Sequence, residues 1–405
     1  MARALILIGG TVMGSGLLYV QAAQRLGLQP ITLSDDPTRY DHFAAKGAET
    51  IRVDTDDLDA LIRECCRLRG TYDIAGITAA ADSFYATVGK LCRHFDLPGP
   101  NPEAIEQCCD KYTQRQLLAA SGVPIPAYRL ASNAADVEDS AAEIGLPVIV
   151  KPVVGSGSSG VQLCHSFGEL AEHTAYLLSG NHIWRASPRI LVEEYAQGPH
   201  YTIDIMGDDV IGIGALDFCR PPHFVYRELT YPAVLTGYKR KRIADVSLNC
   251  LRALGLGWGP TNIELRWTKR GPVVIEVNPR MPGSPCPQMV QLVYGVDLVT
   301  EHIKLVIGDE WNLLRSNPQT AVLRLLVPNR DGTIDWTDLG AADVPGVAEI
   351  KFYIKSGTPI IRKGDYRDCI GYVLATSPNI DLTRQILQRA VDLIHLSIMP
   401  LNTDN

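Results

Sequence analysis

Side chains that bind phosphate and metal ions occur at four places in the sequence, in a fixed order. One lysine begins the segment KYTQRQLLAASG, a second ends the apolar run LPVIVK, and the loop GSGSSG comes soon after it. Further along, two carboxylates and an amide lie in NIELRW and VIEVNPR. These residues are Lys111, Lys151, Glu264, Glu276 and Asn278. Lysines beside a glycine loop suit a nucleotide's phosphates, and carboxylate oxygens suit Mg²⁺, so the set predicts a site for a nucleotide and its metal.

The loop after Lys151 has the composition of a phosphate-binding loop but not the order of the P-loop pattern. In GxxxxGK[ST] the lysine follows the glycines and opens a helix, whereas Lys151 precedes them. Glycine lets the backbone approach a triphosphate closely, and serine adds hydroxyl donors. The alternative is a flexible linker. The residues expected to contact phosphate are Gly155, Ser156, Gly157, Ser158, Ser159 and Gly160.

The segment VIEVNPR predicts a metal-binding strand. Glu276 and Asn278 are two residues apart, so on a strand they project from the same face. Glu264 lies on the preceding predicted strand and can point to the same place. Oxygen ligands of this kind favour Mg²⁺, which keeps several waters and bridges substrate phosphates. Arg280, two residues further, shares this face unless Pro279 ends the strand, and an ordinary surface strand is the alternative.

In type and order these features resemble the ATP-grasp family, over residues 1 to about 310. The resemblance implies that ATP lies between two α+β subdomains, with Lys111 and Lys151 at its phosphates and the glycine loop closed over them. It also implies catalytic roles for Lys151 and for Arg280, which stabilises the oxyanion and the acyl phosphate. The metal is expected to be Mg²⁺, as two ions that Mn²⁺ can replace, on Glu264, Glu276 and Asn278.

The resemblance places the adenine at the end of the strand RILVEEYAQG. There the backbone pairs with the ring edge, and a nearby carboxylate accepts from the exocyclic amine. The residues concerned are Glu193, Glu194, Tyr195 and Ala196. Many family members have a glutamate a few residues on for the ribose, where this sequence has His200. We expect His200 to take that hydrogen bond, or the ribose to be bound elsewhere.

The family reaction is the ATP-driven joining of a carboxylate to an amine through an acyl phosphate, with release of ADP and phosphate. The turn MPGSP after Arg280 resembles the branch that ligates amino acids into dipeptides, and a proline-broken loop contributes further pocket candidates. Together the substrate candidates are Gly283, Ser284, Arg220, Tyr226 and Arg227. The alternatives are a carboxylase-like or purine-pathway ligase of the same family, and a nucleotide-binding regulatory protein without activity.

The apolar and helical sequence patterns around these residues predict a multidomain α/β and α+β fold with three domains. Residues 1–105 alternate apolar runs with helical patterns, which predicts a parallel α/β domain. The proline-rich stretch at 97–111 marks a boundary. The ATP-grasp domain follows at 106–315, divided into 106–195 with the glycine loop and 196–315 with the metal ligands. A small α+β domain, which resembles the C-terminal domain of the amino-acid ligases, occupies 316–405.

Composition excludes several other classes. The net charge of −7 argues against a nucleic-acid binder. The ten cysteines include no CxxC pair suited to zinc, and no apolar run reaches membrane-spanning length. We therefore expect a cytoplasmic protein with no membrane or nucleic-acid partner. The resemblance implies small-molecule carboxylate and amine substrates and a homodimeric state. The turn at 9–16 lacks the GxGxxG spacing, which leaves an NAD site as the weaker alternative to a tight turn beside a substrate cleft.

Overall fold

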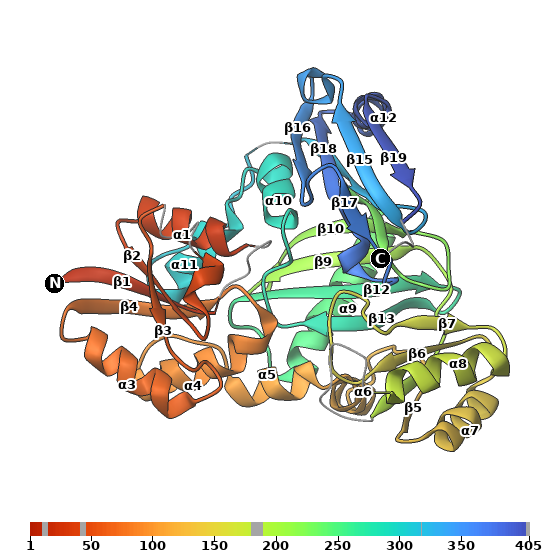
Figure 1. Ribbon diagram of the computed structural model, residues 1–405. Coiled ribbons are helices and arrows are strands. Elements are labelled where there is room, and N and C mark those ends of the chain that lie inside the picture. The colour runs from red at the N-terminus through yellow and green to blue at the C-terminus, as the bar shows by residue number, and fades with distance from the viewer. Residues whose placement is uncertain (10–14, 41–45, 180–188, 317, 402–405) are drawn as a thin grey trace.

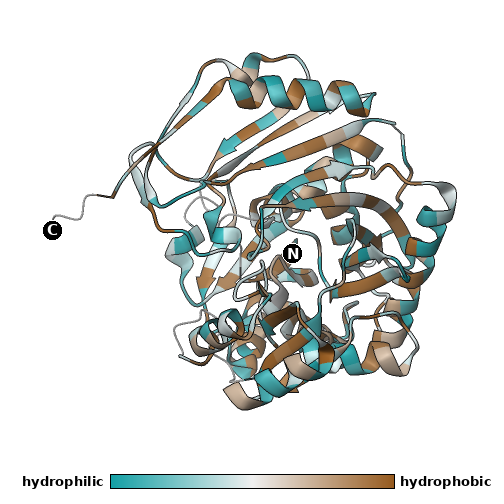
Figure 2. Cartoon of the chain, turned by 90° about the vertical axis from the view of Figure 1, so that its right-hand side faces the viewer, coloured by the Kyte–Doolittle hydropathy of each residue, from teal (hydrophilic) through white to brown (hydrophobic). Residues whose placement is uncertain are grey.

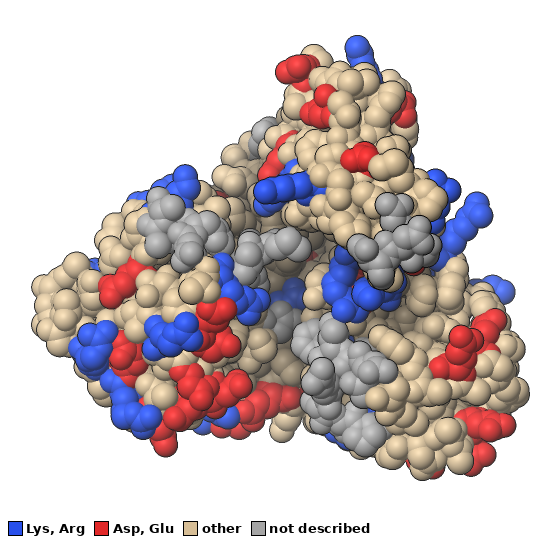
Figure 3. All heavy atoms as spheres, viewed as in Figure 1, with Lys and Arg blue, Asp and Glu red and all other residues tan. Residues whose placement is uncertain are grey.

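The computed structural model of the 405-residue chain has three units (Figure 1), and the space-filling view shows a hollow between them (Figure 3). The structure describes all residues except 10–14, 41–45, 180–188, 317 and 402–405. The prediction for the turn at 9–16 falls largely on residues 10–14 and so lies outside the described residues. No helix in the described part of the chain has both the length and the apolar composition needed to cross a membrane.

The N-terminal unit is a parallel sheet in the order β3-β2-β1-β4, which confirms the predicted parallel α/β domain. Its elements are β1 (Ala2–Ile8), α1 (Gly16–Arg25), β2 (Gln29–Ser34), β3 (Glu49–Arg52), α3 (Leu58–Leu68), β4 (Tyr72–Ala79), α4 (Tyr85–Phe95) and α5 (Pro102–Cys109). Asp57 caps α3 by accepting from the backbone N–H groups of Asp59 and Ala60. Leu61, Cys65 and Leu68 then turn one buried face of α3 toward the sheet.

The next unit is a four-stranded antiparallel sheet in the order β5-β8-β6-β7, with helices packed against it. Its elements are α6 (Lys111–Ala120), β5 (Tyr128–Ala131), α7 (Ala134–Ile144), β6 (Val148–Pro152), β7 (Gln162–Cys164), α8 (Phe167–Leu178) and β8 (Ile190–Glu194). Asp110 caps α6 by accepting from the N–H of Thr113. This cap fixes Lys111 as the first residue of the helix.

The third unit is built on an eight-stranded sheet in the order β13-β12-β9-β10-β11-β14-β18-β16. The elements before residue 315 are β9 (His200–Met206), β10 (Asp209–Phe218), β11 (Tyr226–Tyr231), α9 (Gly237–Leu254), β12 (Pro260–Thr268), β13 (Gly271–Asn278), α10 (Cys286–Tyr294) and α11 (Leu298–Val306). The remaining elements are β14 (Thr320–Leu326), β15 (Gly332–Asp338), β16 (Val347–Phe352), β17 (Thr358–Ile360), β18 (Gly371–Ser377), α12 (Ile380–Asp392) and β19 (Ile394–Met399).

Side chains alternate across this sheet and thereby separate core from cleft. Ile203 of β9 and Ile263 of β12 are buried in one apolar cluster with Ile243 and Val246 of α9. Thr202 of β9 and Glu264 of β12 are cross-strand partners and project from the opposite face. Apolar residues are concentrated in the strands at the centre of the molecule (Figure 2). One face of the sheet therefore forms a core, and the other presents polar groups to the cleft.

Only some strands of the predicted C-terminal domain form a separate sheet; the others belong to the eight-stranded sheet. Strand β14 pairs antiparallel with β11, so β14, β18 and β16 extend the sheet that carries the site. Only β17, β15 and β19 form a separate small sheet. Helix α11 lies within the third unit in sequence but packs against the N-terminal unit. Its residues Val299, Ile303 and Val306 are buried in a cluster with residues of that unit.

Candidate active site

The predicted phosphate and metal residues converge from both subdomains on the central cleft. Lys and Arg side chains gather around the hollow between the lobes (Figure 3). Strands β12 and β13 pair so that Glu264 lies directly opposite Glu276, and Asn262 opposite Asn278. The two glutamates and Asn278 therefore share one face, as the two-residue spacing predicts.

Lys111 connects the glycine loop to the metal strand. Its ammonium lies 2.8 Å from Glu276 Oε1 and donates to the carbonyl of Gly155 at 2.5 Å. Its backbone N–H donates to the carbonyl of Val153 at 3.0 Å. Burial tends to raise the pKa of the Glu276 carboxyl, but Lys111, Lys151 and Arg280 together lower that pKa to about 2. Glu276 is therefore ionised at neutral pH and faces three cations.

Lys151 lies in a buried triad with two other charged residues. Its ammonium is 2.6 Å from Glu193 Oε2, and Arg115 Nε donates to Glu193 Oε1 at 2.6 Å. All three side chains are at most 5 % exposed. Burial lowers the pKa of Lys151 against the opposing effect of Glu193. For Glu193, burial would raise the pKa, but Arg115 and Lys151 lower it overall.

Arg115 is a site residue that the sequence reasoning missed. It is the fifth residue of α6, four after Lys111, so the two cations lie one turn apart on the same helix face. Arg115 also donates to the carbonyl of Ile275 on β13. The four-residue spacing from Lys111 could have indicated that Arg115 belongs to the site. However, an arginine in a polar segment such as KYTQRQ is also typical of a solvent-exposed helix.

Glu264 is held by two residues that were predicted for other roles. His200 Nε2 lies 3.0 Å from Glu264 Oε2, and the Tyr226 hydroxyl donates to Oε1 at 2.5 Å. Burial and Glu264 both raise the pKa of Tyr226 well above its usual value. His200 and Tyr226 thus face a predicted metal ligand. Their predicted contacts to ribose and substrate stay predictions.

The end of β8 contacts the turn between β12 and β13. Glu194 pairs with Arg270 at 2.7 Å, and its other oxygen accepts from the N–H of Ala127 at 3.2 Å. Tyr195 is half-buried and Ala196 is buried. Both Glu193 oxygens are engaged by cations, one by Arg115 and one by Lys151.

The glycine loop packs against the C-terminal domain as well as Lys111. The backbone N–H of Tyr366 donates to the carbonyl of Gly157 at 3.1 Å. Gly157 has a φ of +63°, and an added Cβ would lie 2.4 Å from the Tyr366 ring. Only glycine fits both the backbone conformation and this contact. Ser159 is buried, and the other loop residues are half-buried.

The substrate candidates are only partly brought together. Arg280 lies close enough to Glu276 to lower its pKa, and its Nη1 donates to the carbonyl of Met281 at 3.1 Å. Ser284 accepts from Gln288 at 3.0 Å, and Gly283 is exposed in the turn before α10. Arg220 is exposed. Arg227 follows Tyr226 on β11, points to the other face and pairs with exposed Asp217, away from Glu264.

The donor set suits a hard divalent cation whose remaining ligands come from substrate. Among the described residues no three His, Cys, Asp or Glu side chains form a metal-binding group. Glu264 and Glu276 are an opposed pair of carboxylates, and Asn278 adds an amide oxygen. Two carboxylates plus phosphate oxygens and water match Mg²⁺, which is seldom held in all-protein cages. The residues present therefore fit this ion.

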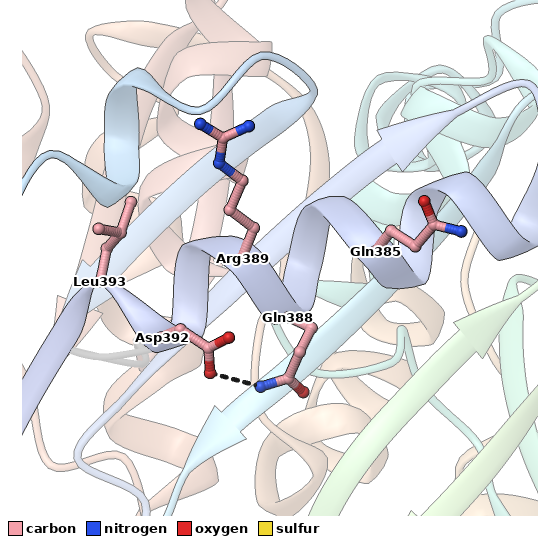
Figure 4. Close-up of a pocket in the computed structure, with 5 residues that line it drawn as sticks. All are labelled: Gln385, Gln388, Arg389, Asp392 and Leu393. Carbon is pink, nitrogen blue, oxygen red and sulfur yellow. Dashed lines mark hydrogen bonds between the residues drawn. The ribbon is translucent and has the colours of Figure 1, made fainter.

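A shallow depression elsewhere in the molecule involves none of these groups. It has a volume of about 460 Å³ and lies along α12 (Figure 4). Its lining residues are Gln385, Gln388, Arg389, Asp392 and Leu393. Gln388 donates to Asp392 at 2.7 Å within this wall. The depression shares no residue with the cleft.

Comparison with known proteins agrees with this geometry. Residues 110–314 match the family described as "Carbamoyl-phosphate synthase L chain, ATP binding domain", and residues 324–399 match "L-amino acid ligase C-terminal domain 2". The chain belongs to the ATP-grasp carboxylate–amine ligases. Enzymes of this ATP-grasp family form carbon–nitrogen bonds and bind ATP with Mg²⁺.

Individual relatives of this ATP-grasp chain extend the comparison. An uncharacterized Sinorhizobium fredii protein, y4rH, is 58% identical over 404 residues, which cover 99% of this chain and 84% of that protein. Carnosine synthase 1 of Mus musculus is 28% identical over 335 residues, 76% of this chain but 40% of its own length. The crystal structure of L-amino acid ligase from Bacillus licheniformis matches with a TM-score of 0.84 and 20% sequence identity. The match covers 98% of this chain and 99% of that chain. That likeness shows the shared fold.

Proposed function

We propose that this chain is an ATP-dependent ligase that joins a carboxylic or amino acid to an amine or amino acid. The match of residues 324–399 to the L-amino acid ligase C-terminal domain carries this proposal over the carboxylase and purine-pathway alternatives. The likeness to carnosine synthase, whose name denotes formation of a dipeptide, supports it. The intact set of lysines and carboxylates argues against an inactive regulatory protein.

The proposed reaction has two steps. A substrate carboxylate oxygen attacks the γ-phosphorus of ATP, the bond to the β-phosphate oxygen breaks, and ADP leaves. The amine nitrogen then attacks the acyl carbon, phosphate leaves, and the nitrogen loses a proton to give the amide. The overall reaction therefore converts the carboxylate, the amine and ATP into one amide, ADP and phosphate.

The residues of the cleft have separate tasks in this scheme. Lys111 and Lys151 orient the phosphates, and the glycine loop supplies backbone N–H donors and excludes water that would hydrolyse the acyl phosphate. Arg280 stabilises the negative charge that develops at the acyl oxygen. Glu264, Glu276 and Asn278 would hold Mg²⁺, which supplies charge neutralisation at the phosphates when bound. We propose two ions, with Mn²⁺ as a substitute.

The remaining site assignments belong to the same proposal. The backbone from Glu194 to Ala196 meets the adenine edge, with Glu193 beside it. Gly283 and Ser284 face the acceptor carboxylate, and Arg220 and Tyr226 contribute to the pocket wall. Arg227, which points to the other face of β11 and pairs with Asp217, is left out of that wall. We also propose a cytoplasmic location and a homodimeric state, and sedimentation of the purified chain tests the homodimer.

The experiment that tests the proposal is phosphate release from MgATP across single amino acids, small carboxylic acids and their pairs. Mass spectrometry of every active mixture identifies the product. We expect release that requires a pair, with a product one water lighter than the sum of the two. Release with bicarbonate and one amine, or nucleotide binding without turnover on any pair, would contradict amide ligation and favour the alternatives.

A further inference from the structure

One arginine in the cleft lies among three aromatic rings and has no role in the scheme above. Arg266 is two residues after Glu264 on β12, so the two side chains project from the same face. Its guanidinium carbon lies 5.2 Å from the ring centroid of Tyr195, 5.8 Å from Phe224 and 5.9 Å from Phe218. Distances within about 6 Å allow cation–π attraction, so all three rings attract this cation.

The polar contacts of Arg266 are weak by comparison. Its Nη1 donates to the Tyr195 hydroxyl at 3.3 Å and to the carbonyl of Gly198 at 3.5 Å, both at the long limit for a hydrogen bond. Within the described part of the chain, Arg266 has no carboxylate at ion-pair distance. Arg270, in the turn between β12 and β13, instead forms a 2.7 Å ion pair with Glu194. The Arg266 side chain is half-buried, so part of its surface remains accessible.

The three rings come from segments that meet where the two subdomains join. Tyr195 follows β8, Phe218 ends β10, and Phe224 lies in the loop before β11. That loop reaches the first subdomain, because the N–H of Leu163 on β7 donates to the carbonyl of Pro222 at 3.0 Å. The cluster thus lies beside the backbone proposed to meet the adenine edge.

We infer that Arg266 contacts the nucleotide base, with its guanidinium plane stacked on the purine ring. This inference rests on the proposed function, because it takes the cleft to be the ATP site. The planar, weakly hydrated guanidinium stacks on aromatic faces, and base stacking on flat side chains makes a large contribution to binding. Arg266 would then determine how strongly the enzyme prefers a purine nucleotide.

The test is displacement of a fluorescent ADP labelled on its ribose, by ADP, by CDP and by inorganic tripolyphosphate, each with Mg²⁺. Arg266→Leu should weaken ADP about tenfold, because cation–π and stacking contacts are of that size. It should weaken CDP less, since a pyrimidine offers a smaller face, and leave tripolyphosphate unchanged because it has no base. Arg266→Lys should retain part of the affinity for ADP.

The matched control is Arg69→Leu, which removes another arginine over a ring, 4.4 Å from the Phe95 centroid in the N-terminal unit. It should bind all competitors as the wild type does. Unchanged ADP affinity in Arg266→Leu, or an equal loss for tripolyphosphate, overturns the inference. If Arg266→Leu does not fold, Arg266→Lys and Phe224→Leu give the same comparison. A wild-type chain that fails to bind the labelled ADP would instead refute the proposed function.

Discussion

Replacing Glu193 by glutamine should destabilise the chain strongly, because this carboxylate neutralises two buried cations. Both oxygens lie 2.6 Å from a cationic nitrogen, one of Arg115 and one of Lys151, and the Glu193 side chain is 3 % exposed. Breaking a buried ion pair by removal of one partner costs about 3 to 5 kcal/mol. Glutamine can still accept one hydrogen bond, so we expect the lower end, about 3 kcal/mol.

The measurement is thermal unfolding of wild type and Glu193→Gln by circular dichroism. For a domain of about 200 residues, about 3 kcal/mol corresponds to a decrease in Tm of roughly 6 to 12 °C. The double variant Glu193→Gln with Lys151→Met removes one of the stranded cations and should recover part of that loss. An unchanged Tm in the single variant would refute the argument that the triad is a coupled buried unit.

The pH dependence provides a second check with a definite sign. The folded pKa of Glu193 is lowered from its ordinary value of 4.5, so its contribution to stability is present above that pH. This contribution is lost as pH falls through the folded pKa. The Tm difference between wild type and Glu193→Gln should therefore be largest at neutral pH and shrink below pH 4.5. A difference that grows on acidification would contradict the assignment.

Three further predictions concern the cleft. Glu276→Ala should reduce turnover by about a hundredfold or more while circular dichroism shows an intact fold, and wild-type turnover would refute the metal assignment. Lys151→Ala should raise the KM for ATP, measured by phosphate release, more than the KM for either acid or amine. His200→Ala should raise the Mg²⁺ concentration needed for half-maximal nucleotide binding by about tenfold, because it removes a hydrogen bond that orients Glu264; an unchanged Mg²⁺ requirement would refute that role.

Local pattern was enough to predict the strands that carry the chemistry. The spacing of Glu276 and Asn278 fixes their common face, because side chains alternate on any strand, and β12 and β13 are neighbours in both sequence and sheet. Lys151 was predictable in the same way, since it ends an apolar run that forms β6. Such features depend on a few adjacent residues.

Features set by distant pairing could not be predicted. Glu193 binds Arg115 from 78 residues away, and no sequence pattern in either segment predicts this contact. The same holds for β14, which pairs with β11 and so joins the C-terminal strands to the sheet of the site. The separate sheet of β15, β17 and β19 was also missed. β15 carries acidic residues and β17 has only three residues, so hydrophobic alternation is weak there.

The ion pair between Lys111 and Glu276 explains how nucleotide and metal would be bound together. Their 2.8 Å contact pairs the two charges directly, and Lys151 and Arg280 add to the positive charge that faces Glu276. A cation at Glu276 alone would repel the Lys111 ammonium, and a phosphate at Lys111 alone would face the Glu276 carboxylate. When phosphate and metal bind together, the phosphate pairs with Lys111 and the metal pairs with Glu276, so no charge is left without a partner of opposite sign. The cleft should therefore favour the metal–nucleotide complex over either component alone.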